Sequence, residues 1–365
     1  MRRLTEDMPG SGGTLRADPE DFRVDEEIPY APSGSGDHLF LRVEKRGMDT
    51  FEAVRRLVRG LGLDPGRARG VGAAGLKDRH AVARQWLSLP WPGGARLPAP
   101  GPLAEGLELL EVARHAHKLR RGHVARNRFS VVLREVPPGG LDRAATTLEA
   151  LRARGLPNRF GPQRFGRAGD NPERARAILA GRERPPRDRR LAGLLLSSLQ
   201  SELFDRVLEL RLEDGRWDEP RLGDRMQKHR FDDAGEPLTG GPEFWVDDPE
   251  AERPRMRALA ISPMARLPGR RLAAARGEAA TLEARAVRDV GLEAETLQRL
   301  GAGVFRSLRV PLGPSARVDA VADDPEAFRV TVVLPAGSYA TVLLDELAKP
   351  AQPLTRRLPE PGGSR

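Results

Sequence analysis

The chain of 365 residues contains no cysteine. That absence excludes a disulfide framework, a thiolate nucleophile and a zinc site built on cysteine. Long apolar runs are also missing, since none approaches the ~20 residues that a membrane-spanning helix needs. The N-terminal stretch MRRLTEDMPGSGG has no apolar core of the kind that a secretory signal carries. We therefore expect a soluble, cytoplasmic protein with no membrane association.

Lysine is scarce, and arginine carries most of the positive charge. Lysine and arginine together number 61 against 52 acidic residues, which gives a formal net charge of +9. An excess of basic side chains favours a polyanionic partner, because each neutralised phosphate releases condensed counterions. A GC-rich genome would also raise the arginine content, so the bulk charge leaves both explanations open. The lysines are Lys45, Lys77, Lys118, Lys228 and Lys349.

The length suggests about two domains, and the hydrophobic pattern changes along the chain. Strand-like alternation occurs near both ends, and helical periodicity dominates the middle. We therefore expect an α/β fold with a mixed sheet, built from both chain ends, and a more helical insertion between them. The expected strands cover 21–28, 38–46, 82–89, 107–114, 128–136, 316–321 and 328–335. The expected helices cover 49–61, 141–154, 172–181, 191–213, 250–260, 271–285, 293–301 and 338–347.

The stretch GVGAAGLKDRHAVARQ at 70–85 has the glycine spacing of a dinucleotide-binding loop, at Gly70, Gly72 and Gly75. Such a loop needs a strand before it, a helix opening at its last glycine and an acidic residue about 20 residues later. Here a helical pattern precedes the glycines, a strand pattern follows them, and the expected position falls in PWPGGARLPAP, which has no acid. We therefore expect the glycines to permit a tight turn or close backbone approach, and we disfavour a nicotinamide-dependent oxidoreductase.

Two stretches are basic and contain no acidic residue. RHAHKLRRGHVARNRF at 114–129 suits either a polyanion site or a solvated connector. The second, at 152–167, interleaves Phe160 and Phe165 with arginines. Rings and arginines together suit stacking on exposed bases and binding of phosphates, whereas each phenylalanine taken alone favours a place in the core.

Three histidines lie inside the first basic stretch, at His115, His117 and His123. The neighbouring arginines would repel a metal cation. We therefore expect these histidines to face phosphate or solvent, and we expect no metal site.

Five stretches together carry a resemblance to a known family. They are PEDFRVDE at 19–26, AGLKDRHAVARQW at 74–86, RHAHKLRRGHVARNRFSVVLREV at 114–136, LPNRFGPQRFG at 156–166 and LPAGSYAT at 334–341. In sequence and in order, they resemble motifs of the TruD family of tRNA pseudouridine synthases, over residues 14 to 347. The resemblance implies isomerisation of uridine to pseudouridine in tRNA, at position 13 of the D arm. It also implies a pseudouridine synthase catalytic domain interrupted by an inserted TRUD domain.

Domain boundaries follow from the pattern and the resemblance together. We expect the catalytic domain to comprise 1–155 plus 314–348 and the inserted domain to comprise 156–313. The remaining tail, 349–365, is rich in proline, glycine and arginine, and we expect it to be disordered. A monomer is the expected state.

The resemblance also implies roles for particular residues. Matched residue by residue, the essential acid falls on Asp78. The base-stacking and pocket positions resemble Phe22, Asn127 and Tyr339, and Lys77 and Phe129 lie in motifs near the site. The chain departs from the family pattern at Ala83, where threonine is common, and at Tyr339, where phenylalanine is common. The residues expected to contact RNA are Arg79, His80, Lys118, Arg120, Arg121 and Arg126.

The implied reaction breaks a C–N glycosidic bond, turns the base and forms a C–C bond. It is redox-neutral and needs no external atoms, so we expect no cofactor. Asp78 would either attack C1′ of the ribose or remove the C2′ proton to give a glycal, and the sequence leaves both routes open. Lys77 would favour the ionised form of this acid if the two side chains converge. The competing hypothesis is an RNA-binding protein of the same fold without catalysis.

Overall fold

The computed structural model describes residues 2–15, 18–166 and 168–350. Most of the expected tail, from residue 351 onward, lies outside the described residues. Within the described ranges, no helix is long and apolar enough to cross a membrane. The chain forms two compact units, which we describe separately. Unit 1 contains residues 2–12, 142–166, 168–314 and 337–350, and unit 2 contains 13–15, 18–141 and 315–336.

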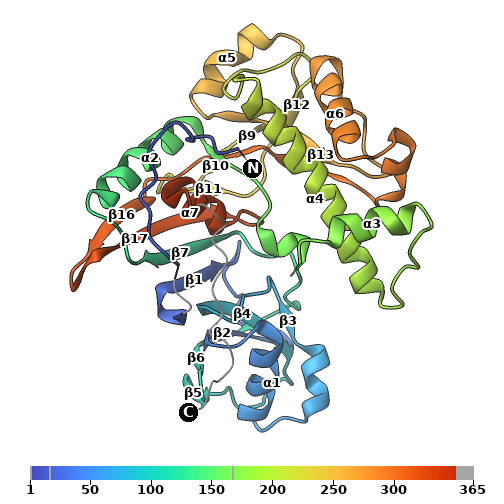
Figure 1. Ribbon diagram of the computed structural model, residues 1–365. Helices are drawn as coiled ribbons and strands as arrows, with labels where there is room; N and C mark the ends of the chain where they lie inside the picture. The colour runs from blue at the N-terminus through green and yellow to red at the C-terminus, as the bar shows by residue number, and fades with distance from the viewer. Residues whose placement is uncertain (1, 16–17, 167, 351–365) are drawn as a thin grey trace, which may run out of the picture. The chain divides into compact units, whose positions relative to one another are not determined.

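Unit 2 is built on a nine-stranded mixed sheet, in agreement with the expected fold class (Figure 1). The strand order is β16-β17-β7-β1-β4-β2-β6-β5, and β3 pairs with β4 outside this path. Only β1 and β4 run parallel, while their other neighbours are antiparallel. The strands are β1 (Phe22–Glu27), β2 (His38–Arg46), β3 (Gly72–Ala73), β4 (Val82–Pro90), β5 (Gly101–Ala104), β6 (Leu107–His115), β7 (Arg126–Leu133), β16 (Arg317–Val321) and β17 (Asp324–Pro335).

One helix, α1 (Thr50–Gly60), packs against this sheet. Asp49 caps it, because its side chain accepts a hydrogen bond from the Glu52 backbone N–H, as the sequence pattern predicts. Ala53 and Leu57 on the buried face of α1 join leucines of β2 and β4 in one apolar core. Two 3₁₀ turns, Pro19–Asp21 and Pro65–Gly70, complete the regular elements of this unit.

Unit 1 contains the remaining helices, one four-stranded sheet and two two-stranded sheets (Figure 1). The helices are α2 (Gly140–Arg154, from its third residue), α3 (Asn171–Leu179), α4 (Arg189–Glu213), α5 (Pro249–Arg257), α6 (Gly277–Asp289) and α7 (Ala340–Ala348). The strands are β8 (Leu156–Pro157), β9 (Arg225–Lys228), β10 (Arg230–Phe231), β11 (Pro237–Leu238), β12 (Glu243–Trp245), β13 (Ile261–Leu267), β14 (Val304–Ser307) and β15 (Arg309–Val310). Two 3₁₀ turns cover Pro162–Phe165 and Ala294–Arg299.

The four-stranded sheet of unit 1, in the order β12-β9-β13-β14, was not expected from the sequence. Its strands β9 and β12 are four and three residues long, too short to show a period of two. The longest strand, β13, carries Pro263, a residue that usually argues against a strand interior. The expected helical elements of the middle are therefore accompanied by a sheet that the sequence pattern did not predict.

The expected helix at 271–285 is also displaced. The backbone N–H groups of Arg270 and Arg271 donate to the carbonyls of Gly301 and Ala302. These hydrogen bonds compete with helix formation, so α6 begins only at Gly277. The short helix expected at 293–301 is present as a 3₁₀ helix, Ala294–Arg299.

Candidate functional site

Asp78 lies in unit 2, on the irregular segment between β3 and β4. Hydrogen bonds hold its backbone on both sides. The ammonium of the fully buried Lys45 donates to the Asp78 carbonyl at 2.6 Å, and the N–H of the preceding residue, Lys77, donates to Thr50 Oγ1 at 2.8 Å. Thr50 Oγ1 in turn donates to Gln85 Oε1 at 3.0 Å. The peptide of Asp78 is therefore fixed by β2, α1 and β4.

The Asp78 side chain itself is exposed. Within the described residues its carboxylate has neither an ion pair nor a hydrogen-bond donor. The next residue, Arg79, is also exposed and faces Asp49 at 3.7 Å, and His80 is half-buried. The fold thus presents one unpaired carboxylate on a restrained backbone, which is a suitable arrangement for a nucleophile or base.

Lys77 belongs to a buried polar group that includes side chains of β1 and β7. Its ammonium lies 2.6 Å from Glu26 Oε2 and donates to Asn127 Oδ1 at 2.8 Å. The other Glu26 oxygen accepts the Trp86 N–H at 3.1 Å. The lysine and glutamate side chains are 8% and 0% exposed, so the positive charge of Lys77 is neutralised by Glu26. Lys77 and Asp78 form no ion pair in the part of the chain that the structure describes.

The glycines before Asp78 allow close backbone approach. A Cβ at Gly72 would lie 2.2 Å from the Leu119 carbonyl oxygen, and one at Gly75 would lie 3.1 Å from Glu26 Oε2. The segment then leads into a strand, β4, where a dinucleotide-binding loop requires a helix. The expectation of close approach is confirmed for these two glycines.

Phe22 and Phe129 come from adjacent strands, β1 and β7. Their rings meet edge to face, with centroids 6.1 Å apart. Phe22 is buried and Phe129 is half-buried, so the structure places the two predicted positions together in unit 2.

Tyr339 lies in unit 1, at the residue that precedes α7. Its ring centroid is 6.0 Å from that of Phe160, which also packs edge to face on Phe204 at 5.6 Å. Phe160 is buried, so it belongs to the core of unit 1, as expected for this phenylalanine taken alone. Gly161 gives the tyrosine room, because a Cβ there would lie 2.9 Å from Tyr339 Cδ1.

The guanidinium of Arg306 links the motif at 156–166 to the motif at 334–341, which contains Tyr339. It donates to the carbonyls of Asn158 at 2.9 Å and Gly337 at 3.0 Å, and it lies over the Phe160 ring at 4.3 Å. Burial lowers the pKa of Arg306 to about 10, which leaves it charged at neutral pH. Burial also raises the pKa of the nearby Asp205 to about 7, despite the hydrogen bond it accepts from the Phe160 N–H.

The basic stretch 114–129 forms a structured connection between β6 and β7. Leu119 is fully buried, and its N–H donates to Ser88 Oγ at 2.9 Å. Around this anchor Arg120 and Arg121 are exposed and Lys118 is half-buried. Arg126 is half-buried and forms an ion pair with Glu27.

Two of the three histidines in this stretch are packed, contrary to the expectation that they face phosphate or solvent. His115 Nδ1 accepts the Ser33 N–H at 3.1 Å, and its ring stacks on Tyr30 at 5.2 Å. His123 Nδ1 shares a hydrogen bond of 2.7 Å with the Tyr30 hydroxyl. Their partners come from the turn-rich segment between β1 and β2, which the sequence pattern did not connect to them. His117 is exposed, as expected.

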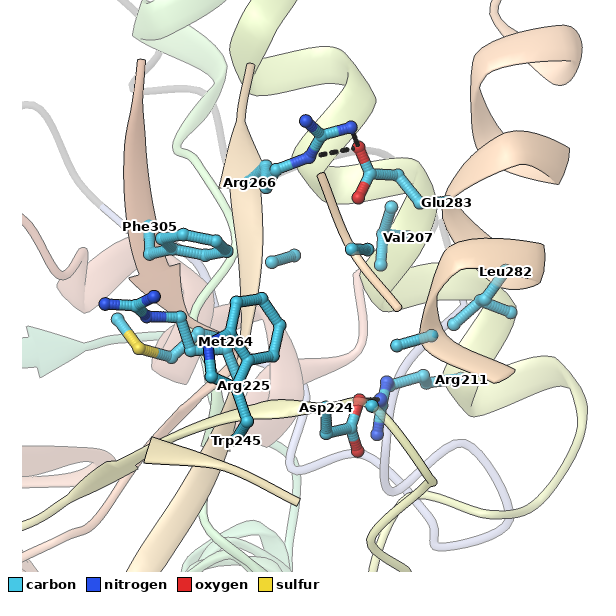
Figure 2. Close-up of a pocket in the computed structure, with 14 residues that line it drawn as sticks. Val207, Arg211, Asp224, Arg225, Trp245, Met264, Arg266, Leu282, Glu283 and Phe305 are labelled. Atoms are coloured by element: carbon cyan, nitrogen blue, oxygen red, sulfur yellow. Dashed lines mark hydrogen bonds and ion pairs between the residues drawn. The ribbon is translucent and has the colours of Figure 1, made fainter. Parts of the chain in front are cut away.

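A hollow in unit 1 lies between the four-stranded sheet and helices α4 and α6 (Figure 2). Ion pairs line it, including Arg266 with Glu283 at 2.6 Å and Arg211 with Asp224. Its volume of about 20 Å³ has room for about one water molecule. None of the predicted site residues lines this hollow, so it is not a candidate for the reaction site.

Comparisons with known proteins agree with one another. The family model described as "tRNA pseudouridine synthase D (TruD)" matches residues 1–183 and 186–347. The chain belongs to the TruD family. Membership in this family makes it a tRNA pseudouridine synthase, an enzyme of the isomerase class.

Curated relatives in the TruD family match almost the whole chain. tRNA pseudouridine synthase D of Anaeromyxobacter dehalogenans strain 2CP-C is 46% identical over 357 residues, which cover 95% of this chain and 96% of the relative. That of Thermus thermophilus is 40% identical over 349 residues, with 95% and 91% covered. The crystal structure of a putative tRNA pseudouridine synthase D from Methanosarcina mazei shares the fold, with a TM-score of 0.70, 22% identity and 96% of both chains covered.

Sequence reasoning missed two buried charged residues, Glu26 and Lys45, that hold the segment carrying Asp78, although the strand pattern contained a signal. Glu26 shares the buried alternation of Phe22 and Val24 along β1, and Lys45 shares that of Val43 along β2. A charged residue in a buried register is rare unless it is paired. Each position therefore predicts a buried polar partner, which the structure identifies as Lys77 for Glu26 and as backbone carbonyls for Lys45.

Proposed function

We propose that this TruD-family enzyme isomerises uridine at position 13, in the D arm of tRNA, and that Asp78 is its catalytic carboxylate. The observation that carries the proposal is the exposed, unpaired carboxylate on a peptide held by Lys45 and Thr50. Such restraint lowers the entropy lost when reacting atoms are brought together. Position 13 itself rests on the family resemblance.

The reaction redistributes bonds within one nucleotide. The C1′–N1 bond breaks, the uracil turns, and C1′ bonds to C5 while the C5 proton is lost and N1 gains a proton. Asp78 would enable the first step, either by attacking C1′ to form an ester or by removing the C2′ proton to form a glycal. No atom or electron comes from outside, so the chain needs no cofactor.

Asn127 is proposed to recognise the uracil edge, and its hydrogen bond with Lys77 determines which of its amide groups faces the base. An ammonium can only donate, so it fixes Oδ1 of the Asn127 amide as the acceptor. The amide NH₂ then remains as a donor, without an acceptor in the described part of the protein. It suits O4 of uracil, because the amine at the same position of cytosine would meet it donor to donor.

Stacking is proposed for Phe22 and Tyr339. The target nucleotide must leave its stack, which costs a few kcal/mol. Stacking on an aromatic ring offsets roughly 1–3 kcal/mol per base. Phe129 supports Phe22 through their edge-to-face contact. The proposed RNA contacts outside the uracil are Arg79, His80, Lys118, Arg120, Arg121 and Arg126.

The organisation expected from the sequence forms part of the proposal. The catalytic domain would comprise 1–155 plus 314–348, and the inserted domain 156–313. The enzyme would act as a monomer in the cytoplasm.

The test compares the wild-type enzyme with Asp78→Asn on unmodified tRNA. Carbodiimide labelling with primer extension maps any pseudouridine. We expect formation at position 13 in the wild type, none in Asp78→Asn, and equal tRNA affinity, because the backbone clamp does not use the carboxylate. Asp37→Asn removes another exposed acid and serves as the control with full activity. Tight tRNA binding without pseudouridine in the wild type would favour an RNA-binding protein that lacks catalysis.

A further inference from the structure

A further arginine-rich feature lies in unit 1, on the segment RERPPRDRR at 182–190 that connects α3 to α4 (Figure 1). We call this segment the arginine loop. All five of its arginines are exposed. They are Arg182, Arg184, Arg187, Arg189 and Arg190.

The two acidic residues of the arginine loop are engaged with other groups. Glu183 pairs with Arg174 of α3 at 2.9 Å. Asp188 caps α4, since its carboxylate accepts the backbone N–H of Arg190 at 2.7 Å. The five guanidinium groups of the loop therefore have no carboxylate or other hydrogen-bond partner in the described ranges.

This arrangement contrasts with that of several other arginines of unit 1, which are paired with acids. Arg206 binds Glu213 and Asp289, and Arg216 binds Glu219 and Glu278. Five like charges within nine residues repel one another and destabilise the folded state slightly. Because these five exposed guanidinium groups lie within nine residues and have no partner in the described residues, they present a surface suited to a polyanion.

The arginine loop is also restrained before any partner arrives. The backbone N–H groups of Arg182 and Glu183 both donate to the Ala177 carbonyl at the end of α3. Pro185 and Pro186 fix φ in the middle of the loop, and the Asp188 cap holds its far end. Restraint of this kind reduces the ordering cost of binding.

We propose that the arginine loop binds the phosphate backbone of tRNA. This inference rests on the proposed function for its polyanion. The loop offers a partner exposed guanidinium groups, whose paired N–H donors match the oxygens of a phosphate. Its contribution is to affinity and to the salt dependence of binding, not to the chemical step.

The test is the slope of log affinity against log salt for unmodified tRNA, measured with Arg184→Gln, Arg187→Gln and Arg189→Gln combined. Each lost phosphate contact reduces the slope by nearly one, so we expect a reduction of roughly 2 to 3. The matched control is the combined Arg257→Gln, Arg271→Gln and Arg288→Gln variant, which removes the same charge from exposed arginines of unit 1 outside the loop. The control should keep a slope close to that of the wild type.

A loop variant with the wild-type slope would overturn the proposal, and so would a control that loses as much slope as the loop variant. Thermal unfolding should not shift to lower temperature, because the substituted guanidiniums have no partner in the described parts of the fold and their removal relieves mutual repulsion. Single-turnover pseudouridine formation at saturating tRNA should also be unchanged. If the loop variant shows the expected loss of slope but the wild type makes no pseudouridine, only the proposed chemistry is contradicted. If the wild type binds no tRNA, both proposals are overturned.

Discussion

In the pair of Lys77 and Glu26, each buried charge is stabilised by the other. Both side chains are almost inaccessible to water, and their charged atoms lie 2.6 Å apart. Taking two charges out of water is costly, and replacing a whole buried pair by neutral groups is often tolerated. Removing one partner is not tolerated, because it leaves the other charge buried and unpaired. The pair therefore explains the order of the segment that carries Asp78 more directly than it explains the chemistry of that acid.

Lys77→Met should lower the free energy of unfolding by about 3–5 kcal/mol, because it leaves Glu26 without its counter-charge. Adding Glu26→Gln to that variant should recover a large part of the loss, since Gln keeps an oxygen for the Trp86 N–H. Urea unfolding of the wild type, the two single variants and the double variant measures this coupling. Strictly additive losses would show that the two side chains do not interact.

At the scale of elements, a close contact between β3 and the basic stretch determines where that stretch lies on unit 2. Gly72 approaches the Leu119 carbonyl so closely that no Cβ fits. Leu119 in turn anchors Arg120 and Arg121, which are exposed and follow it on the chain's path to β7. A glycine in one strand thus fixes where two candidate phosphate contacts lie.

Gly72→Ala should displace the Leu119 backbone, lower the free energy of unfolding by about 1–3 kcal/mol through overpacking, and weaken tRNA binding. Gly93→Ala is the matched control, because a Cβ there meets nothing within 4 Å and its φ is not positive. Chemical denaturation and filter-binding titration with tRNA would give both quantities. Equal behaviour of the two variants would mean that the contact at Gly72 is unimportant.

The strands of unit 2 could be predicted because most are long enough for their alternation to be visible. The pattern at 38–46 coincides with β2, and the expected cap at Asp49 opens α1. The sheet of unit 1 could not be predicted, because its strands are short and are stabilised by pairing with strands distant in the chain. β9, for example, pairs with β12 and β13. The local alternation of hydrophobic residues does not indicate which distant strands pair.

The site was predictable to a similar degree. Asp78, Asn127 and Phe22 are predicted site residues from the motifs that carry them, and unit 2 contains all three. The orientation of Lys77 was not predictable, because its partner Glu26 lies on a strand far earlier in the chain. Only the fold brings these two residues together.

At the scale of the whole molecule, the net charge of +9 is distributed unevenly. Many arginines of both units are paired with acids, whereas the five arginines of the arginine loop, and Arg120 and Arg121 of the basic stretch in unit 2, are exposed and have no side-chain partner in the described residues. Because counterion release counts only charges that reach phosphates, these two regions should account for most of the salt dependence of tRNA binding.

Arg120→Ala combined with Arg121→Ala should weaken tRNA binding and reduce its salt slope by up to roughly 2. The control is Arg69→Ala with Arg96→Ala, which removes two other exposed arginines of unit 2. Combining the Arg120 and Arg121 changes with those in the arginine loop should give the sum of the two slope reductions if both regions hold the same tRNA. An unchanged slope would exclude Arg120 and Arg121 as phosphate contacts.

The clamp on Asp78 is made to main-chain atoms, so the identity of the side chain at that position is independent of the forces that hold it. The chain also has no thiol of its own. An Asp78→Cys variant would therefore carry a single reactive sulfur at a rigidly held point, where a fluorophore or spin label could be attached without competing attachment sites. The hydrogen bonds that would position the acid for the reaction would then hold the backbone beneath an attached probe, which suits distance measurements.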